Sequence, residues 1–231
     1  MASLKERSLE VQHRLLEAYG QPHWRNRLAP LDELISTILS QNTNDDNRDV
    51  AFTRLRDRFD SWEQVRDVDP DEVIDAIRPA GLANQKGPRI QSALRAISEE
   101  RGELDLTFLR DMPADEVKRW LTKFKGVGPK TAAIVMLFSL DLPAFPVDTH
   151  IHRVSGRLGL RPESASAEKT HKILADLFPP ETYYSAHLNI IRHGRRVCKA
   201  RKPDCAHCLL TDLCDYYAEL DPKPAALDPA Q

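Results

Sequence analysis

The amino-acid sequence predicts an all-α protein. Apolar residues recur at the three- and four-residue spacing of amphipathic helices through most of the 231 residues. Capping residues and prolines mark several helix starts, and no segment shows the apolar and polar alternation of a half-buried strand. With 41% hydrophobic residues, the chain can bury a sizeable core in one or two domains. We expect about ten helices.

In the first half of the chain, helices are expected over residues 4–19, 31–39, 51–59 and 84–100. Gly20 ends the first of these, as glycine often does at a helix C-terminus. Ser61 and Gln64, three residues later, form a capping-box pattern, and Asp69 precedes a proline at the first helical position. Two further helices should therefore begin near Ser61 and Asp69.

The second half of the chain continues the helical pattern as far as residue 218. One helix is expected to end at Phe124, because four apolar residues share a face: Val117, Trp120, Leu121 and Phe124. The next helix, over residues 129–138, is apolar nearly all round and should be buried. Further helices follow Ser166 and Pro180. Residues 219–231, rich in Pro, Ala and Asp, are expected to form a flexible tail.

Two glycines and a lysine stand where these two central helices meet. Gly126 and Gly128 flank Val127 and allow the backbone to approach a ligand closely. Pro129 and Lys130 then open a helix whose free N–H groups can bind a phosphate. An ordinary helix–turn–helix packing unit would share the glycines. It would not explain Lys130, whose charge faces an unfavourable helix dipole.

Four cysteines lie close together near the C-terminus: Cys198, Cys205, Cys208 and Cys214. This grouping favours a metal centre over disulfides and fits a reducing compartment. Zinc ribbons usually show two Cys-x₂-Cys pairs, whereas this chain has one. The loop also carries five basic residues and no acid among them: Arg195, Arg196, Lys199, Arg201 and Lys202. A protein with net charge −2 would need such a local cluster to bind nucleic acid.

The stretch from Phe124 to His152 resembles the helix-hairpin-helix, Gly-Pro-Asp loop and lysine of the endonuclease III family of DNA glycosylases. The cysteine separations of six, two and five residues are similar to the iron–sulfur loop of that family. The resemblance extends from Leu31 to Tyr216. One local departure is Phe124-Lys125, where the family usually has Leu-Pro before the first glycine.

The resemblance implies a six-helix barrel over residues 31–141 and an iron–sulfur domain from residues 1–30 and 142–218, with DNA and the active site in the cleft between them. It implies that Lys130 forms a Schiff base with C1′ of a sugar and that Asp148 assists. From residue type alone, Asp148 is a helix N-cap. The four cysteines would hold a [4Fe–4S] cluster, with a buried zinc as the alternative.

The resemblance also implies a set of DNA-binding residues: Gln41, Asn42, Leu82, Gly126, Val127, Gly128, Lys130 and His150. The family usually reads Ser-Ala-Gln-Ala-Thr-Asp in its first loop. An ungapped alignment puts Asn42 in place of the glutamine, so lesion range and opposite-base preference stay open. Without the resemblance, Gln41 would be a solvent contact and Leu82 a core residue. His152 is expected to be structural.

The expected function is that of a bifunctional DNA glycosylase and AP lyase, which removes oxidised pyrimidines from double-stranded DNA. The chain should be a cytoplasmic, nucleoid-associated monomer, since it shows no signal peptide and no membrane-spanning run. One alternative is a monofunctional mismatch glycosylase, whose members generally lack a lysine at position 130. Another is a non-catalytic DNA-binding or redox-sensing module. Lys130 together with Asp148 favours the first function, and the preferred lesion stays open.

Overall fold

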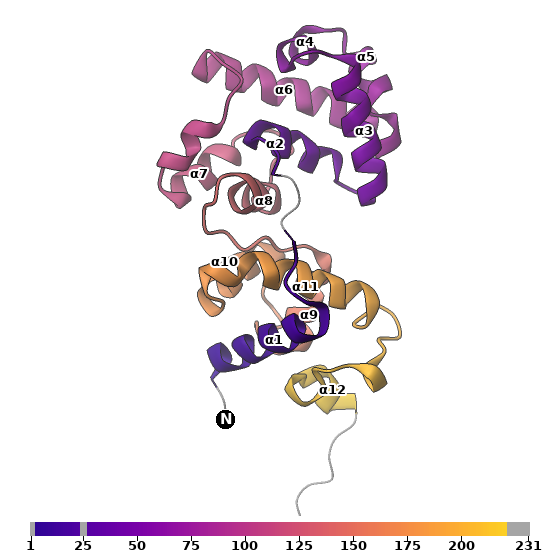
Figure 1. The fold of residues 1–231 in the computed structure, drawn as a ribbon, viewed down its shortest axis with the longest axis vertical. Helices are drawn as coiled ribbons and strands as arrows, with labels where there is room; N and C mark the ends of the chain where they lie inside the picture. The colour runs from indigo at the N-terminus through magenta and orange to yellow at the C-terminus, as the bar shows by residue number, and fades with distance from the viewer. Residues whose placement is uncertain (1–2, 24–26, 221–231) are drawn as a thin grey trace, which may run out of the picture. The chain divides into compact units, whose positions relative to one another are not determined.

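The structure is a computed structural model that describes residues 3–23 and 27–220. Its helices confirm the all-α prediction, because the described residues contain no strand (Figure 1). The α-helices are α1 (Leu4–Tyr19), α2 (Pro30–Leu39), α3 (Asp45–Arg58), α4 (Trp62–Asp67), α5 (Pro70–Ala76), α6 (Ala83–Arg101), α7 (Ala114–Leu121), α8 (Pro129–Ser139), α9 (Thr149–Arg157), α10 (Ala167–Leu177), α11 (Tyr183–Arg196) and α12 (Asp215–Leu220). Of the expected tail, everything after residue 220 lies outside the described residues.

The chain divides into two compact units. One unit is formed by Trp24–Pro146 and contains α2 to α8. The other combines Met1–His23 with Val147–Gln231, so that α1 packs against α10 and α11 although they are far apart in sequence. Each unit has its own buried residues.

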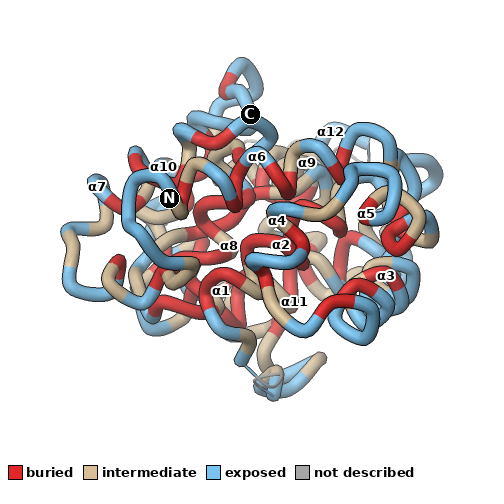
Figure 2. The backbone as a smooth tube through the Cα atoms, turned by 90° about the horizontal axis from the view of Figure 1, so that it is seen from above, coloured by how far each residue is buried: buried red, intermediate tan, exposed pale blue. Residues whose placement is uncertain are grey.

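Helix α2 lies at the centre of the Trp24–Pro146 unit, where it packs against α3, α6 and α8. Its apolar residues Leu34, Ile38 and Leu39 are completely buried. Helix α8 is buried on most of its surface, as its apolar sequence predicts, and the tube in Figure 2 is largely red over both helices. The small residues Ala132 and Ala133 of α8 are buried too. This packing fixes the first turn of α8, where Lys130 stands.

The predicted helix starts are confirmed by side-chain hydrogen bonds. Ser61 caps α4, Asp69 caps α5 and Ser166 caps α10, each by accepting a backbone N–H from the first turn. The capping box at Ser61 differs in its second half, because the Gln64 side chain accepts from the N–H of Asp60 rather than that of Ser61. The side-chain oxygen of Gln64 therefore accepts from the backbone N–H one residue before the expected one.

The helix expected to end at Phe124 ends earlier, at Leu121. Thr122 turns its hydroxyl back to the carbonyl of Lys118, and the N–H of Val127 then bonds to the carbonyl of Phe124 in a turn. The expected apolar face is nevertheless correct, since Phe124 and the three apolar residues before it are buried. Phe124 therefore takes the buried position expected of a helical residue, although it lies in a turn beyond the end of the helix.

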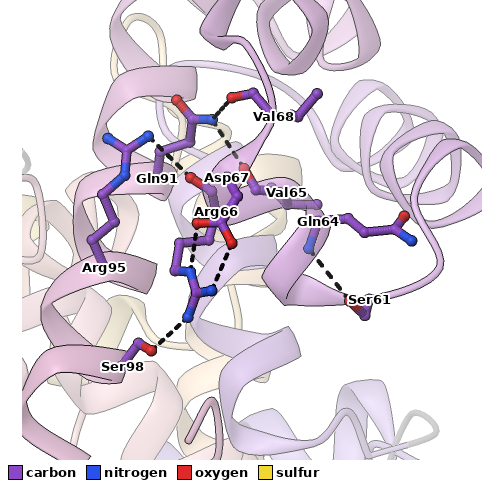
Figure 3. Close-up of polar contacts among 9 residues, drawn as sticks. All are labelled: Ser61, Gln64, Val65, Arg66, Asp67, Val68, Gln91, Arg95 and Ser98. Carbon is purple, nitrogen blue, oxygen red and sulfur yellow. Dashed lines mark hydrogen bonds and ion pairs between the residues drawn. The ribbon is translucent and has the colours of Figure 1, made fainter. Parts of the chain in front are cut away.

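A buried amide on α6 closes the C-terminal end of α4. The side chain of Gln91 donates to the carbonyls of Val65 and Val68, at 3.0 and 2.8 Å (Figure 3). Helix ends leave such carbonyls without backbone donors, and Gln91 supplies them inside the protein. Nearby, Arg66 bonds to Ser98 of the same α6 helix. These contacts lock α4 onto α6.

In the second unit, two arginines of α1 hold the C-terminal segment. Arg7 donates to the carbonyl of Leu158 and to Asp215 at the start of α12. Arg14 donates to the carbonyl of Leu209 and forms a bidentate pair with Asp212. Both contacts cross more than 140 residues of sequence, so α1 fastens the cysteine-rich segment directly.

Candidate functional site

The glycine hairpin leads directly into helix α8. Gly126 has a φ of 89°, which only glycine adopts readily, and Val127 between the glycines is buried. Gly128 is the N-cap of α8, and no side chain bonds to the N–H groups of the first turn. A Cβ at Gly128 would meet no atom within 4 Å, so this face of the hairpin is open. A helix N-terminus with free N–H groups and open space in front of it is an arrangement that can bind an anion.

Lys130 stands in the first turn of α8, and its side chain is exposed. No acidic residue shares that turn. The amine therefore points away from the buried face of α8, within one helical turn of the open hairpin. The Lys130 amine is open to water, and a bound substrate would have to exclude that water.

The loop after α2 contacts the hairpin through Gln41. The side-chain N–H of Gln41 donates to the carbonyl of Gly126 at 2.9 Å. Asn42 follows with a left-handed backbone, at a φ of 53°. The structure thus brings two predicted DNA-binding segments together. It gives their residues different tasks, since Gln41 turns toward the hairpin while Asn42 forms the bend.

Leu82 is the N-cap of α6 and is one of the exposed large apolar residues, with 46% of its surface accessible. Its φ of 51° is left-handed, which is unfavourable for a branched side chain. Gly81 before it also has a positive φ, of 67°. A core position for Leu82 is therefore wrong: the backbone turns this leucine outward.

Asp148 and His150 lie at the start of α9, in the unit that contains the cysteines. The Asp148 carboxylate accepts the N–H of Ile151 at 2.8 Å, as expected of an N-cap. Arg153 donates to Nδ1 of His150, so a neutral His150 carries its proton on Nε2. His152 instead contacts the carbonyl of Ala165 through Nε2. His152 is held by this structural contact.

All four cysteines line one small cavity, together with Arg157 and Tyr216. Burial raises the pKa of the Cys208 and Cys214 thiols, and the neighbouring cysteines raise it further. Burial also lowers the pKa of His193, which lies 3.6 Å from the Cys208 sulfur, to about 4. A bound metal would reverse the effect on the thiols, because metal-bound cysteine is deprotonated.

The four cysteines are compatible with the ligands of an iron–sulfur loop. Within residues 3–23 and 27–220, no three His, Cys, Asp or Glu side chains converge as ligands of a single metal ion. All four cysteines line a common cavity, and a structural zinc would take thiolates about 2.3 Å from one centre. Arg157 donates to the Cys198 sulfur at 3.3 Å. Soft thiolates around a cavity suit an iron–sulfur cluster.

Several residues that support these segments were not predicted from the sequence. Arg153 and Arg157 of α9 donate to backbone carbonyls of the cysteine loop, at Cys198 and Lys199. Lys86 of α6 is buried and bonds to the carbonyls of Leu39 and Ala80. Helical spacing places Lys86 four residues before the buried Ile90, and this was the available signal.

Comparison with known proteins agrees with this geometry. Residues 35–180 match the family described as HhH-GPD superfamily base excision DNA repair protein. The chain is 33% identical to endonuclease III of Sulfolobus acidocaldarius over 218 residues, which cover 94% of each chain. It is 38% identical over 176 residues to a putative DNA glycosylase of Arabidopsis thaliana, and this alignment spans 76% of the chain and 60% of the plant protein.

Solved structures give the same result. An endonuclease III structure, described as a trapped covalent intermediate with DNA, superposes with a TM-score of 0.81 at 28% identity, covering 95% of this chain and 99% of that one. A thermostable thymine-DNA glycosylase shares the fold, with a TM-score of 0.74 at 20% identity over 94% and 97% of the two chains. In the parts that the structure describes, no helix is both long and apolar enough to span a bilayer. The chain belongs to the HhH-GPD superfamily of base excision DNA repair proteins and is a DNA glycosylase of that family.

Proposed function

We propose that the chain is a bifunctional DNA N-glycosylase and AP lyase that removes oxidised pyrimidines from double-stranded DNA. The observation that carries the proposal is the exposed Lys130, in the first turn of α8 beside an open glycine hairpin. The hairpin would bind a backbone phosphate through its N–H groups, and the amine would reach the sugar of a neighbouring nucleotide. The endonuclease III that was trapped covalently with DNA supports this chemistry by analogy.

The proposed reaction begins when the neutral amine of Lys130 attacks C1′ of the damaged nucleotide. The C1′–N glycosidic bond breaks, and the base leaves with the bonding electron pair and gains a proton. The sugar ring then opens at the C1′–O4′ bond to give a Schiff base. Loss of a C2′ proton expels the 3′ phosphate oxygen, which breaks the strand. Water finally hydrolyses the Schiff base and releases Lys130 as the amine.

Asp148 would assist by stabilising positive charge at the sugar and by moving a proton. One of its oxygens caps α9 by accepting the N–H of Ile151, which fixes the orientation of the carboxylate. A carboxylate has several lone pairs, so the cap and the catalytic task are compatible. His150, whose Nε2 carries the proton in the neutral form, would serve as a DNA contact.

Two loops of the Trp24–Pro146 unit would open the duplex. Base flipping leaves a gap that a side chain must fill. Leu82 is exposed on a left-handed backbone, and Asn42 bends its own loop in the same conformation. Gln41 is tied to Gly126, so we assign the gap-filling task to Asn42 and Leu82. Gln41 would act on DNA through the loop that it holds.

Cys198, Cys205, Cys208 and Cys214 would hold a [4Fe–4S] cluster through four thiolates. When bound, such a cluster cross-links the loop and can exchange electrons. The chain itself presents basic side chains on this loop: Arg196, Lys199, Arg201 and Lys202 are all exposed. Rigid cations of this kind would position DNA phosphates. The active protein would bind DNA as a monomer. One of its domains would comprise residues 31–141, and the other would comprise residues 1–30 together with residues 142–218.

Measurement of base excision and strand cleavage tests the proposal. Duplexes that each contain one oxidised pyrimidine, one mismatched thymine or one abasic site are incubated with the wild type and with Lys130→Ala. We expect the wild type to release the oxidised base and cut the strand, and we expect Lys130→Ala to do neither while it still binds DNA. Release of thymine without strand cleavage would favour a monofunctional mismatch glycosylase. Binding without turnover on any duplex would favour a non-catalytic module.

A further inference from the structure

A buried lysine joins the two loops that we expect to enter DNA. Lys86 of α6 has 1% of its surface exposed. Its Nζ donates to the carbonyl of Leu39 at 2.7 Å and to the carbonyl of Ala80 at 2.8 Å. Leu39 is the last residue of α2, directly before the loop of Gln41 and Asn42. Ala80 ends a short 3₁₀ helix (Arg78–Ala80), directly before Gly81 and Leu82.

The backbone of Lys86 adds a third contact. Its N–H donates to the carbonyl of Leu82 at 3.0 Å, the first helical bond of α6. One residue therefore holds the base of one loop and both sides of the other. Two of the three acceptors are carbonyls at helix ends, which lack backbone donors. A buried ammonium group with three N–H bonds can satisfy such acceptors where water cannot reach them.

Burial of this lysine is unfavourable in itself. Loss of water lowers the pKa of Lys86, and no carboxylate compensates for its charge among the contacts that the structure describes. A methionine or leucine would avoid the desolvation of a charge but would leave the carbonyls of Leu39 and Ala80 without this donor. An apolar residue would fill the space without joining the two segments, whereas Lys86 bonds to the segments before both loops at once.

The contacts of Lys86 form a frame that joins the two loops, and Gln41 extends this frame to the hairpin. Its amide donates to the carbonyl of Gly126, so the loop after α2 is fastened at its base by Lys86 and at its tip by the hairpin. We propose that Lys86 is a positioning residue that holds the Asn42 and Leu82 loops at a fixed separation for duplex opening. This inference rests on the proposed use of the two loops in opening DNA.

Fluorescence of a base in DNA measures this opening without any chemistry. The probe is a duplex with a non-cleavable tetrahydrofuran abasic site and 2-aminopurine on the opposite strand, because unstacking raises the emission of 2-aminopurine. Wild type, Lys86→Met and Gln91→Met are compared at saturating protein. Gln91 is a matched control, since it is also buried on α6 and donates to two carbonyls, but at the end of α4.

We expect both variants to lower the melting temperature, because each leaves two buried carbonyls without donors. Only Lys86→Met should lower the saturated fluorescence rise, by about threefold or more, since small displacements of positioned groups have large effects. An equal rise in Lys86→Met and wild type, an equal loss in both variants, or no rise with wild type would overturn the inference. If Lys86→Met does not fold, Lys86→Gln replaces it. That variant keeps two N–H donors but is too short to reach both carbonyls, and the same outcomes apply.

The outcome is separable from that of the proposed reaction. A selective loss of fluorescence in Lys86→Met would support the frame even if Lys130 formed no Schiff base. Conversely, a Schiff base at Lys130 with unchanged fluorescence in Lys86→Met would leave the chemistry intact and remove the frame.

Discussion

Two residues with strained backbones occupy the loops that we assign to duplex opening. Asn42 and Leu82 have φ values of 53° and 51°, and in folded proteins such conformations cluster at functional sites. Asparagine tolerates this region through its short polar side chain, whereas leucine does not. The exposed Leu82 contributes little to the core. A leucine at a position suited to glycine is consistent with a use of its side chain on the surface.

Leu82→Gly separates stability from function at this position. Glycine relieves the left-handed strain but adds flexibility to the unfolded chain, so the free energy of unfolding should stay within about 1 kcal/mol of wild type. Excision of a paired lesion under single-turnover conditions should fall, because no side chain fills the gap. Urea unfolding and a gel assay measure the two quantities. Excision at the wild-type rate would show that the Leu82 side chain does not fill the gap left by the flipped base.

At the scale of elements, the hairpin depends on the helices around it. A Cβ on Gly126 would approach Cδ of Arg89 on α6 to 2.8 Å, and Gln41 bonds to the carbonyl of the same glycine. The hairpin is thus packed on one side and open at Gly128, where a phosphate can approach. Nε of Arg89 would lie 3.5 Å from the same Cβ, so this arginine packs against Gly126.

Gly126→Ala and Gly102→Ala make a matched pair. Both glycines have positive φ, 89° and 79°, so alanine should cost about 1–2 kcal/mol at each. Only at Gly126 does the new methyl group also meet a neighbour, since a Cβ at Gly102 meets no atom within 4 Å. We expect comparable losses of thermal stability but weaker DNA binding for Gly126→Ala alone. Equal DNA affinities in a fluorescence-anisotropy titration would contradict the account.

Sequence patterns predicted the elements better than the contacts between them. Caps such as Ser61 and faces such as that around Phe124 depend on neighbours within one or two turns, which periodicity reports. The early end of α7 depends on the turn of Thr122 and was missed. The bond from Gln41 to Gly126 joins residues 85 positions apart, and local spacing carries no information about it.

The same limit explains the buried Lys86. A lysine near the start of a helix usually extends into solvent, and only its alignment with the apolar face of α6 indicated otherwise. The motif residues Lys130 and Asp148 were named from their resemblance to a family, and their catalytic tasks stay predictions.

At the scale of the whole molecule, helix α1 joins the first residues of the chain to the cysteine-rich end. Arg14 bonds to Asp212 and to the carbonyl of Leu209, both between Cys208 and Cys214. A chain with net charge −2 also presents exposed basic residues on the same cysteine loop. Anchoring by α1 would keep that basic loop in one conformation for DNA.

Arg14→Ala should therefore weaken the C-terminal segment. Because Arg14 is partly exposed, we expect a loss of about 1 kcal/mol in the free energy of unfolding. Glu17→Ala on the same helix is the control, since Glu17 pairs only with the exposed His13 at 3.7 Å among the described ion pairs, and its loss should change little. Denaturant unfolding followed by circular dichroism compares the two. Equal stabilities would argue against the anchoring role of α1.

Trapping with borohydride tests the central claim most directly, namely that Lys130 forms a Schiff base with the sugar. Wild type and Lys130→Ala are incubated with a duplex that carries one oxidised pyrimidine, in the presence of borohydride, and the adduct is mapped by mass spectrometry. We predict a covalent protein–DNA adduct on the peptide that contains Lys130, and none in Lys130→Ala. An adduct that persists in Lys130→Ala, or a wild type that binds the duplex without any adduct, would contradict the account.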